Sequence, residues 1–247
     1  LTSSKTMKNR EKIALALQKE LEPLGFRYLK SNGHFKKKVN KDTIVSMVYL
    51  PDCYYRGLVD VDLLARAEYK DIEGVLYKLT DENVSIRGHF AFICRLEWLI
   101  PESEYTYHDF CFYNYDTEDV FDKKLRKLIW YVKIYMLPYM ESLSHKDSAL
   151  EKAIALDRKF LIHFEYVIPI MYCVWKHDKK AALDYLEEKR QRRLALVEPG
   201  EWERLERLKN GENLRPVDEP IQALMYEEYV KKSQKIKEWI WSQNYGE

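Results

Sequence analysis

Two aspartates that stand two positions apart are the first residues whose spacing suits catalysis. Asp60 and Asp62 fall in a stretch of alternating apolar residues that predicts a β-strand. Side chains two apart on a strand leave the same face, about 7 Å from each other, and two such carboxylates can hold a divalent cation. A metal-dependent hydrolase or nuclease would need a third ligand and a base, which Glu97, Asp109 or His108 would supply. The alternative places both aspartates on the solvated face of an antiparallel sheet.

The segment from Leu96 to Asp122 has an unusual composition, with eight carboxylates and no Lys or Arg. Aromatic side chains crowd its middle and, on strand alternation, would occupy both faces of residues 105–115. Tyrosine offers a rigid contact area with a polar tip, so an acidic, tyrosine-rich surface would complement a basic protein. The residues predicted to contact such a partner are Glu104, Tyr105, Tyr107, His108, Asp109 and Tyr113. The alternative is a central strand that is buried on both sides.

Signatures of other chemistries are missing from the sequence. The six histidines form no His-Glu-x-x-His motif, and there is no Walker loop, Gly-x-Gly-x-x-Gly fingerprint or Gly-x-Ser-x-Gly elbow. The four cysteines lie far apart without a Cys-x-x-Cys pair. We therefore expect a non-enzymatic protein with no catalytic residue and no cofactor.

Charge and hydropathy restrict the partners. The 247 residues include 41 Lys and Arg against 40 Asp and Glu, a balance that argues against a nucleic-acid-binding module. The densest basic run, residues 189–193, is explained by the dipole of a helix C-terminus. No apolar stretch approaches the roughly 20 residues of a spanning helix. We expect a folded cytoplasmic protein with reduced cysteines and neither a membrane nor a nucleic-acid partner.

The hydrophobic periodicity changes near residue 116, from strand-like to helical. Before residue 116, the pattern predicts a helix at 5–23 and a short helix at 71–79. In the same half it predicts strands at 26–30, 35–39, 43–50, 58–65, 90–98 and 105–115. Asn32-Gly33 predicts a hairpin between the first two strands, and the last two are expected to pair with each other. After it, helices are predicted at 117–138, 148–163, 167–176, 179–196, 201–210 and 220–242.

These elements predict an α+β fold. An N-terminal helix and a mostly antiparallel sheet, residues 1–116, are expected to pack against a helical region, residues 117–247, as one compact unit. Pro138 predicts a kink in the long helix that precedes it. That helix is apolar nearly all round, which predicts burial between the sheet and the later helices.

The N-terminal half resembles a known bacterial family. A helix ends in Leu21-Glu22-Pro23-Leu24-Gly25-Phe26, a basic hairpin carries Gly33-His34-Phe35-Lys36, and a strand follows at 44–49. Over residues 10–66 this is similar to domain of unknown function 4304. Residues 175–182 resemble the helical tail of some members, although His177 stands where their turn has Gly. The resemblance implies an association with bacterial toxin and immunity loci, and it brings no catalytic residues.

Together these observations predict a non-enzymatic bacterial binding protein, an immunity-type inhibitor that covers a basic protein partner with the acidic, tyrosine-rich surface. The first alternative is the metal-dependent hydrolase or nuclease that uses Asp60 and Asp62. A second alternative is a small-ligand pocket between sheet and helices, lined by Trp98, Trp130 and Trp175.

Overall fold

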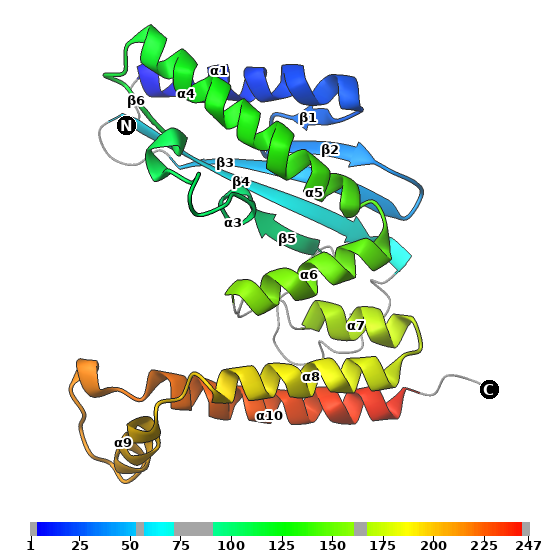
Figure 1. Ribbon diagram of the computed structural model, residues 1–247, viewed down its shortest axis with the longest axis vertical. Helices are drawn as coiled ribbons and strands as arrows, with labels where there is room; N and C mark the ends of the chain where they lie inside the picture. Colours follow the sequence, from blue (N-terminus) through cyan, green and yellow to red (C-terminus); the bar gives the residue numbers. More distant parts are fainter. Residues whose placement is uncertain (1–3, 53–56, 72–90, 161–166, 244–247) are drawn as a thin grey trace. The chain divides into compact units, whose positions relative to one another are not determined.

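The computed structural model describes residues 4–52, 57–71, 91–160 and 167–243 (Figure 1). They form two compact units, residues 4–71 with 91–160, and residues 167–243. The first unit is an antiparallel sheet with helices and the second is helical, so the predicted α+β class is confirmed. The helices between residues 118 and 160 belong to the sheet unit, so the units divide later in the chain than the periodicity does.

The sheet has six antiparallel strands in the order β1-β2-β3-β4-β5, with β6 also paired to β4. Their bounds are β1 Arg27–Leu29, β2 His34–Lys38, β3 Thr43–Asp52, β4 Leu58–Tyr69, β5 Ala91–Arg95 and β6 Cys111–Tyr113. The predicted Asn-Gly hairpin is confirmed, since β1 pairs with β2 and Gly33 has a φ of 69°. That conformation favours glycine, and a Cβ there would lie 2.5 Å from the Tyr49 carbonyl oxygen.

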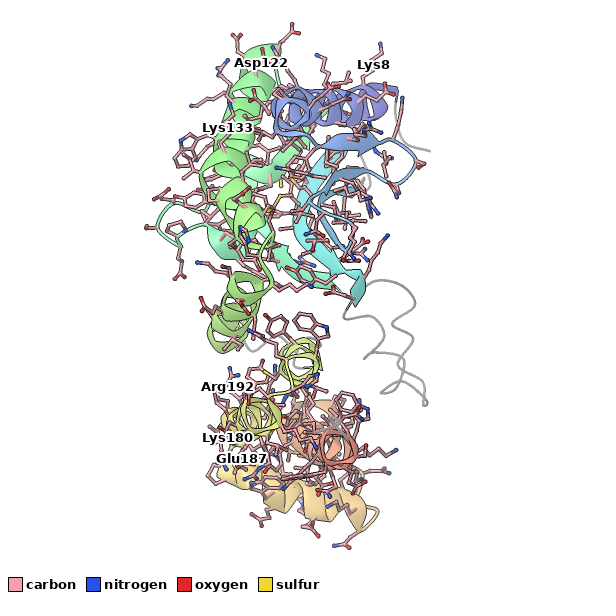
Figure 2. All side chains as sticks on the ribbon, turned by 90° about the vertical axis from the view of Figure 1, so that its right-hand side faces the viewer. Lys8, Asp122, Lys133, Lys180, Glu187 and Arg192 are labelled. Carbon is pink, nitrogen blue, oxygen red and sulfur yellow. The ribbon has the colours of Figure 1, made fainter. Side chains whose placement is uncertain are left out.

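Alternation on β4 gives the sheet one buried face. The odd-numbered residues from Val59 to Ala67 are buried, and β4 packs against α1 (Ser4–Leu21) and α5 (Leu137–Ser142). Figure 2 shows α5 and the helix before it on one side of the sheet. The even-numbered residues Asp60 and Asp62 are half-buried on the opposite face. The predicted strand is thus confirmed and extends to Tyr69.

The second edge of β4 is only partly covered. One edge pairs with β3 from Asp60 to Tyr69, while β6 and β5 share the other, at Leu58–Asp60 and Leu64–Glu68. Between them, no described strand pairs with residues 61–63 on that edge. The predicted hairpin of 90–98 with 105–115 is therefore wrong, because both segments pair with β4 instead.

The predicted strand over 105–115 is also wrong. Residues Tyr107–Phe110 form the 3-10 helix η2, and within 105–115 only Cys111–Tyr113 form a strand. Phe110 is buried, with ring contacts to Tyr105 and Tyr131, while Tyr107 stays 50 % exposed. Burial of one ring, rather than strand alternation, decides which aromatic side chains reach the surface.

The helix that follows the sheet continues past residue 131 through a π-helical turn. α4 (Glu118–Tyr131) is capped by Thr117, whose hydroxyl accepts from the Val120 N–H at 3.4 Å. A π-helical turn, η3 (Val132–Met136), joins it to α5, and the Leu137 N–H donates to the Val132 carbonyl. Pro138 has no N–H and its ring clashes with the carbonyl four residues earlier in an α-helix. We infer that the wider turn relieves that conflict.

The long helix is less buried than predicted. Trp130 is 43 % exposed and Ile134 is 49 % exposed, although both stand in a stretch that is apolar nearly all round. Leu128, Tyr131 and Val132 are the buried residues of this stretch. The helix therefore presents apolar side chains to solvent as well as to the core.

The second unit consists of helices joined by short turns. α6 (Lys146–Phe160) ends the first unit; the second holds α7 (Val167–Trp175), α8 (Lys179–Leu194), α9 (Pro199–Lys209), the 3-10 turn η4 (Pro216–Asp218) and α10 (Ile221–Ser242). His177 has a φ of 62°, a conformation that glycine favours, and Asp178 caps α8 by accepting from the Ala181 N–H at 2.9 Å. Residues 72–79 of the predicted short helix lie outside the described residues. Within the described residues of the chain, no helix has the length and apolarity needed to span a bilayer.

Candidate functional site

A pocket of about 290 Å³ lies at the uncovered stretch of the β4 edge. β4 contributes Asp60, Val61, Asp62 and Leu63; the end of β5 and the short helix α3 (Leu96–Leu99) contribute Arg95, Leu96 and Glu97; the segment around η2 contributes Tyr105, Tyr107 and Phe110. The pocket forms because β5 ends at Arg95 before it reaches β6. Three segments far apart in the sequence therefore meet at one gap in the sheet.

Two tyrosine hydroxyls donate to carboxylates of the pocket. Tyr107 donates to Asp60 Oδ2 at 2.7 Å, and this hydrogen bond is the main cause of a raised Tyr107 pKa. Tyr105 donates to Glu97 Oε2 at 3.4 Å. Burial, followed by the charge of Glu97, raises the pKa of Tyr105 to about 12. Both phenols thus remain protonated donors at neutral pH, because ionising beside a carboxylate is unfavourable.

Arg95 is the one cationic side chain among the described residues that line the pocket. Arg95 Nη1 lies 3.5 Å from Asp62 Oδ2 and 3.5 Å from Glu97 Oε1. Its guanidinium also lies 5.9 Å from the ring centre of Trp98. The described residues that line the pocket include three carboxylates and this one guanidinium, so the described lining is acidic overall.

Side chains of α4 and η3 hold the segment that carries the tyrosines. Tyr131 donates to the Glu104 carbonyl at 2.7 Å and to Asp109 Oδ2 at 3.1 Å. Lys127 pairs with Asp109 at 2.6 Å, and the hydrogen bond between them raises the Lys127 pKa. Tyr135 donates to Glu104 Oε2 at 2.6 Å, which raises the Tyr135 pKa to about 12. These bonds fix the position of residues 104–109 beside the sheet.

The six residues predicted to contact a partner take three different places. Tyr105 and Tyr107 line the pocket, and exposed His108 lies beside Tyr107, with ring centres 6.1 Å apart. Glu104 and Asp109 accept the hydrogen bonds from α4 and η3. Tyr113 belongs to β6, stacks on Tyr115 at 4.8 Å, and does not line the pocket. Strand alternation predicts one face for Tyr105, Tyr107, Asp109 and Tyr113 and the opposite face for His108. Because residues 107–110 form a 3-10 helix, that shared face does not form.

The aspartates of the metal-site alternative share one strand face, as predicted. In the part of the chain that the structure describes, however, no group of three or more His, Cys, Asp or Glu side chains is placed to hold a metal ion. Of the proposed third ligands, Glu97 lines the pocket, Asp109 is paired with Lys127, and His108 is exposed. The metal-dependent alternative stays a prediction that rests on Asp60 and Asp62.

Sequence reasoning missed Arg95 as a pocket residue and considered Glu97 only as a metal ligand. The available signal was the polar half of the alternation in residues 90–98, where both stand opposite the apolar positions. It also missed the exposure of Trp130, which contacts the rings of Tyr131 at 5.3 Å and Tyr135 at 5.8 Å. No local pattern distinguishes an exposed tryptophan in an apolar helix from a buried one.

Comparison with known proteins identifies no relative: no family model, no curated protein and no solved structure matches this chain. The resemblance of residues 10–66 to domain of unknown function 4304 therefore stays a prediction. What the chain does has to be argued from the pocket and its surroundings.

Proposed function

We propose that this chain is a non-enzymatic binding protein that covers a basic protein partner, in the manner of an immunity-type inhibitor. The single observation that carries the proposal is the convergence of Asp60, Asp62 and Glu97 with Tyr105 and Tyr107 at one pocket. Carboxylates attract a basic partner and set its orientation, while tyrosine rings supply contact area at low entropic cost.

The surroundings of the pocket suit a protein interface. Tyr107 is 50 % exposed and Trp130 is 43 % exposed, and Trp and Tyr are enriched among the residues that dominate binding energy. A continuous set of ring contacts leads from Tyr105 through Phe110 and Tyr131 to Trp130. The loop that leads into Tyr105, residues 101–106, is acidic, with Glu102 and Glu104 exposed. An aromatic centre beside acidic residues is the arrangement that complements a basic surface.

The loop is also rigid enough to act as a preformed surface. Its tyrosine-bearing segment is held by the hydrogen bonds from Tyr131 and Tyr135, so little conformational entropy remains to be lost on binding. Preorganisation of this kind is what tight inhibitors of enzymes commonly use.

Affinity capture from a native lysate, followed by mass spectrometry, tests the proposal. The wild-type chain should retain one basic protein at matched stoichiometry in moderate salt. The double variant Tyr107→Ala with Trp130→Ala should lose it, because both exposed rings would be removed while the buried residues stay.

The matched control is Tyr115→Ala with Trp241→Ala, which also removes one exposed Tyr and one exposed Trp. This control should retain the partner. An empty eluate from the wild-type chain, or equal retention by the two double variants, would overturn the proposal.

A further inference from the structure

The charge lining the pocket is unbalanced. Among the described residues that line it, Asp60, Asp62 and Glu97 contribute three negative charges and Arg95 contributes one positive charge, which leaves a formal charge of minus two. The raised Tyr105 pKa, caused by burial and then by Glu97, is consistent with a negative potential there. A low-dielectric pocket concentrates such a potential and favours a cationic occupant.

The Glu97 carboxylate has only long contacts with its neighbours. Glu97 receives contacts at 3.4 Å from Tyr105 and 3.5 Å from Arg95, and the same Arg95 nitrogen serves Asp62 at 3.5 Å. Charge-assisted hydrogen bonds between guanidinium and carboxylate are normally about 2.7–2.9 Å long. Glu97 can therefore accept a shorter and stronger hydrogen bond than its present neighbours donate.

The walls and the size of the pocket restrict the shape of the occupant. Tyr105, Tyr107 and Phe110 present aromatic rings, against which a planar cation can stack. A volume of about 290 Å³ lies at the lower end of the range for ligand pockets, roughly 300–1,000 Å³, and suits one amino-acid side chain. Large cofactors do not fit this description.

We infer that the pocket takes the guanidinium group of an arginine side chain of the partner. The inference rests on the proposed function, since it names the group by which the basic protein is recognised. A guanidinium is planar, stays charged and carries a fork of donors that matches a carboxylate, whereas an ammonium is a compact point charge without a stacking face. The rings and the carboxylates of the pocket thus favour arginine over lysine.

Titration with acetyl-arginine amide, followed by NMR of the labelled full chain, tests the inference. The amide should perturb the signals of Arg95, Glu97 and Tyr107 with millimolar affinity. Acetyl-citrulline amide, which has nearly the same shape without the charge, should bind at least about tenfold more weakly because the charge-assisted bonds are lost. Acetyl-lysine amide, with its α-amino group blocked and its ε-ammonium free, should bind at least about threefold more weakly because it can neither stack nor bond in a fork.

Variants separate pocket binding from non-specific attraction. Glu97→Gln keeps the shape of the side chain and should weaken binding of the arginine amide about fivefold or more. Glu141→Gln, which changes an exposed acid of α5 outside the pocket, should leave that binding unchanged. Unchanged far-ultraviolet circular dichroism will establish that both variants are folded. The inference would be overturned if the citrulline amide or the lysine amide bound as tightly as the arginine amide. It would also be overturned if Glu97→Gln bound the arginine amide as tightly as the wild-type chain does.

The result is distinguishable from failure of the proposed function. If arginine amide binds as expected but lysate capture yields no basic protein, the guanidinium site stands and the inhibitor proposal falls. If a basic protein is captured but the amides do not perturb the pocket, the inhibitor proposal stands and the arginine inference falls.

Discussion

The two ends of β4 carry the same kind of charged residue on the same face and use it differently. At one end Glu68 is 2 % exposed and lies 3.4 Å from Arg66 Nε and 3.7 Å from Lys36 Nζ. At the other end Asp60 and Asp62 are half-buried and border the pocket. One end thus holds a carboxylate enclosed by cations, and the other presents carboxylates to a space that a ligand can enter.

The difference lies in the neighbouring strand rather than in β4 itself. β5 runs beside Leu64 to Glu68, whereas no described strand covers residues 61–63 on that edge. Alternation decides which face a side chain takes, but its accessibility depends on where the partner strand ends. We therefore expect the Glu68 end to stabilise the sheet, whereas the Asp60 end borders a pocket that a ligand can enter.

The largest predicted effect is on stability at the closed end. Glu68→Ala should lower the free energy of unfolding by about 3 kcal/mol, because it leaves the buried sides of Lys36 and Arg66 without their carboxylate. Asp60→Ala should cost less than about 0.5 kcal/mol, because the hydrogen bond that Asp60 accepts from Tyr107 is exposed and water can replace it. Urea denaturation of both variants measures the two losses. Equal losses would contradict the contrast between the two ends.

The next effect concerns β6, which pairs with β4 next to the uncovered residues 61–63. Asp116 accepts from the Tyr113 N–H at 2.9 Å and from Lys124 at 2.9 Å, which ties β6 to α4. Asp116→Ala should cost about 2 kcal/mol in urea denaturation, since a charged, mostly buried acceptor is lost. Asp122→Ala removes an exposed acid of α4 (Figure 2) and should change stability by less than about 0.5 kcal/mol. If the two variants are equally stable, Asp116 does not anchor the pocket side of the sheet.

A third prediction concerns alkaline pH. The pKa of Tyr105 is raised from the ordinary 10 to about 12, so the folded state holds this proton more tightly than the unfolded state does. Its contribution to stability is therefore complete below pH 10 and is lost as the pH rises from about 10 to about 12. NMR of ring-labelled tyrosine should place the Tyr105 titration near pH 12 and move it downward in Glu97→Gln. A titration of Tyr105 that is unaffected by Glu97→Gln would disprove the assigned electrostatic coupling.

The smallest predicted effect is on stability at the open end. Tyr107→Phe removes only the hydroxyl that donates to Asp60, and Tyr107 is 50 % exposed. Thermal and urea unfolding should show a loss below about 0.5 kcal/mol, because water can replace an exposed hydrogen bond. A loss as large as that of Glu68→Ala would show that Tyr107 is a structural residue.

Much of the fold could be predicted from local patterns. The helix before Gly25, the hairpin at Gly33 and the alternation of β4 all depend on residues close in sequence, and the structure has each of them. The helices of the second unit follow from apolar spacing in the same way. These features depend on backbone conformation and on one buried face, both of which a single segment encodes.

The pocket could not be predicted because it depends on contacts between distant segments. The aromatic pattern of residues 105–115 fits a strand, yet packing of Phe110 on Tyr131 draws it into a 3-10 turn. The gap beside residues 61–63 exists only because β5 and β6 pair with different parts of β4. Neither contact leaves a local mark in the sequence, so strand alternation placed Tyr113 on the same face as Tyr105 and Tyr107, whereas Tyr113 does not line the pocket.

The most direct test of the central claim is the affinity of the captured basic protein for variants of this chain, measured by isothermal titration calorimetry. Tyr107→Ala should weaken binding at least about tenfold, equivalent to about 1.4 kcal/mol, because it removes an exposed ring at the pocket. Tyr115→Ala, which removes a more exposed ring outside the pocket, should leave the affinity unchanged. If instead Tyr107→Ala binds as tightly as the wild-type chain, the pocket is not the site at which a basic partner is recognised.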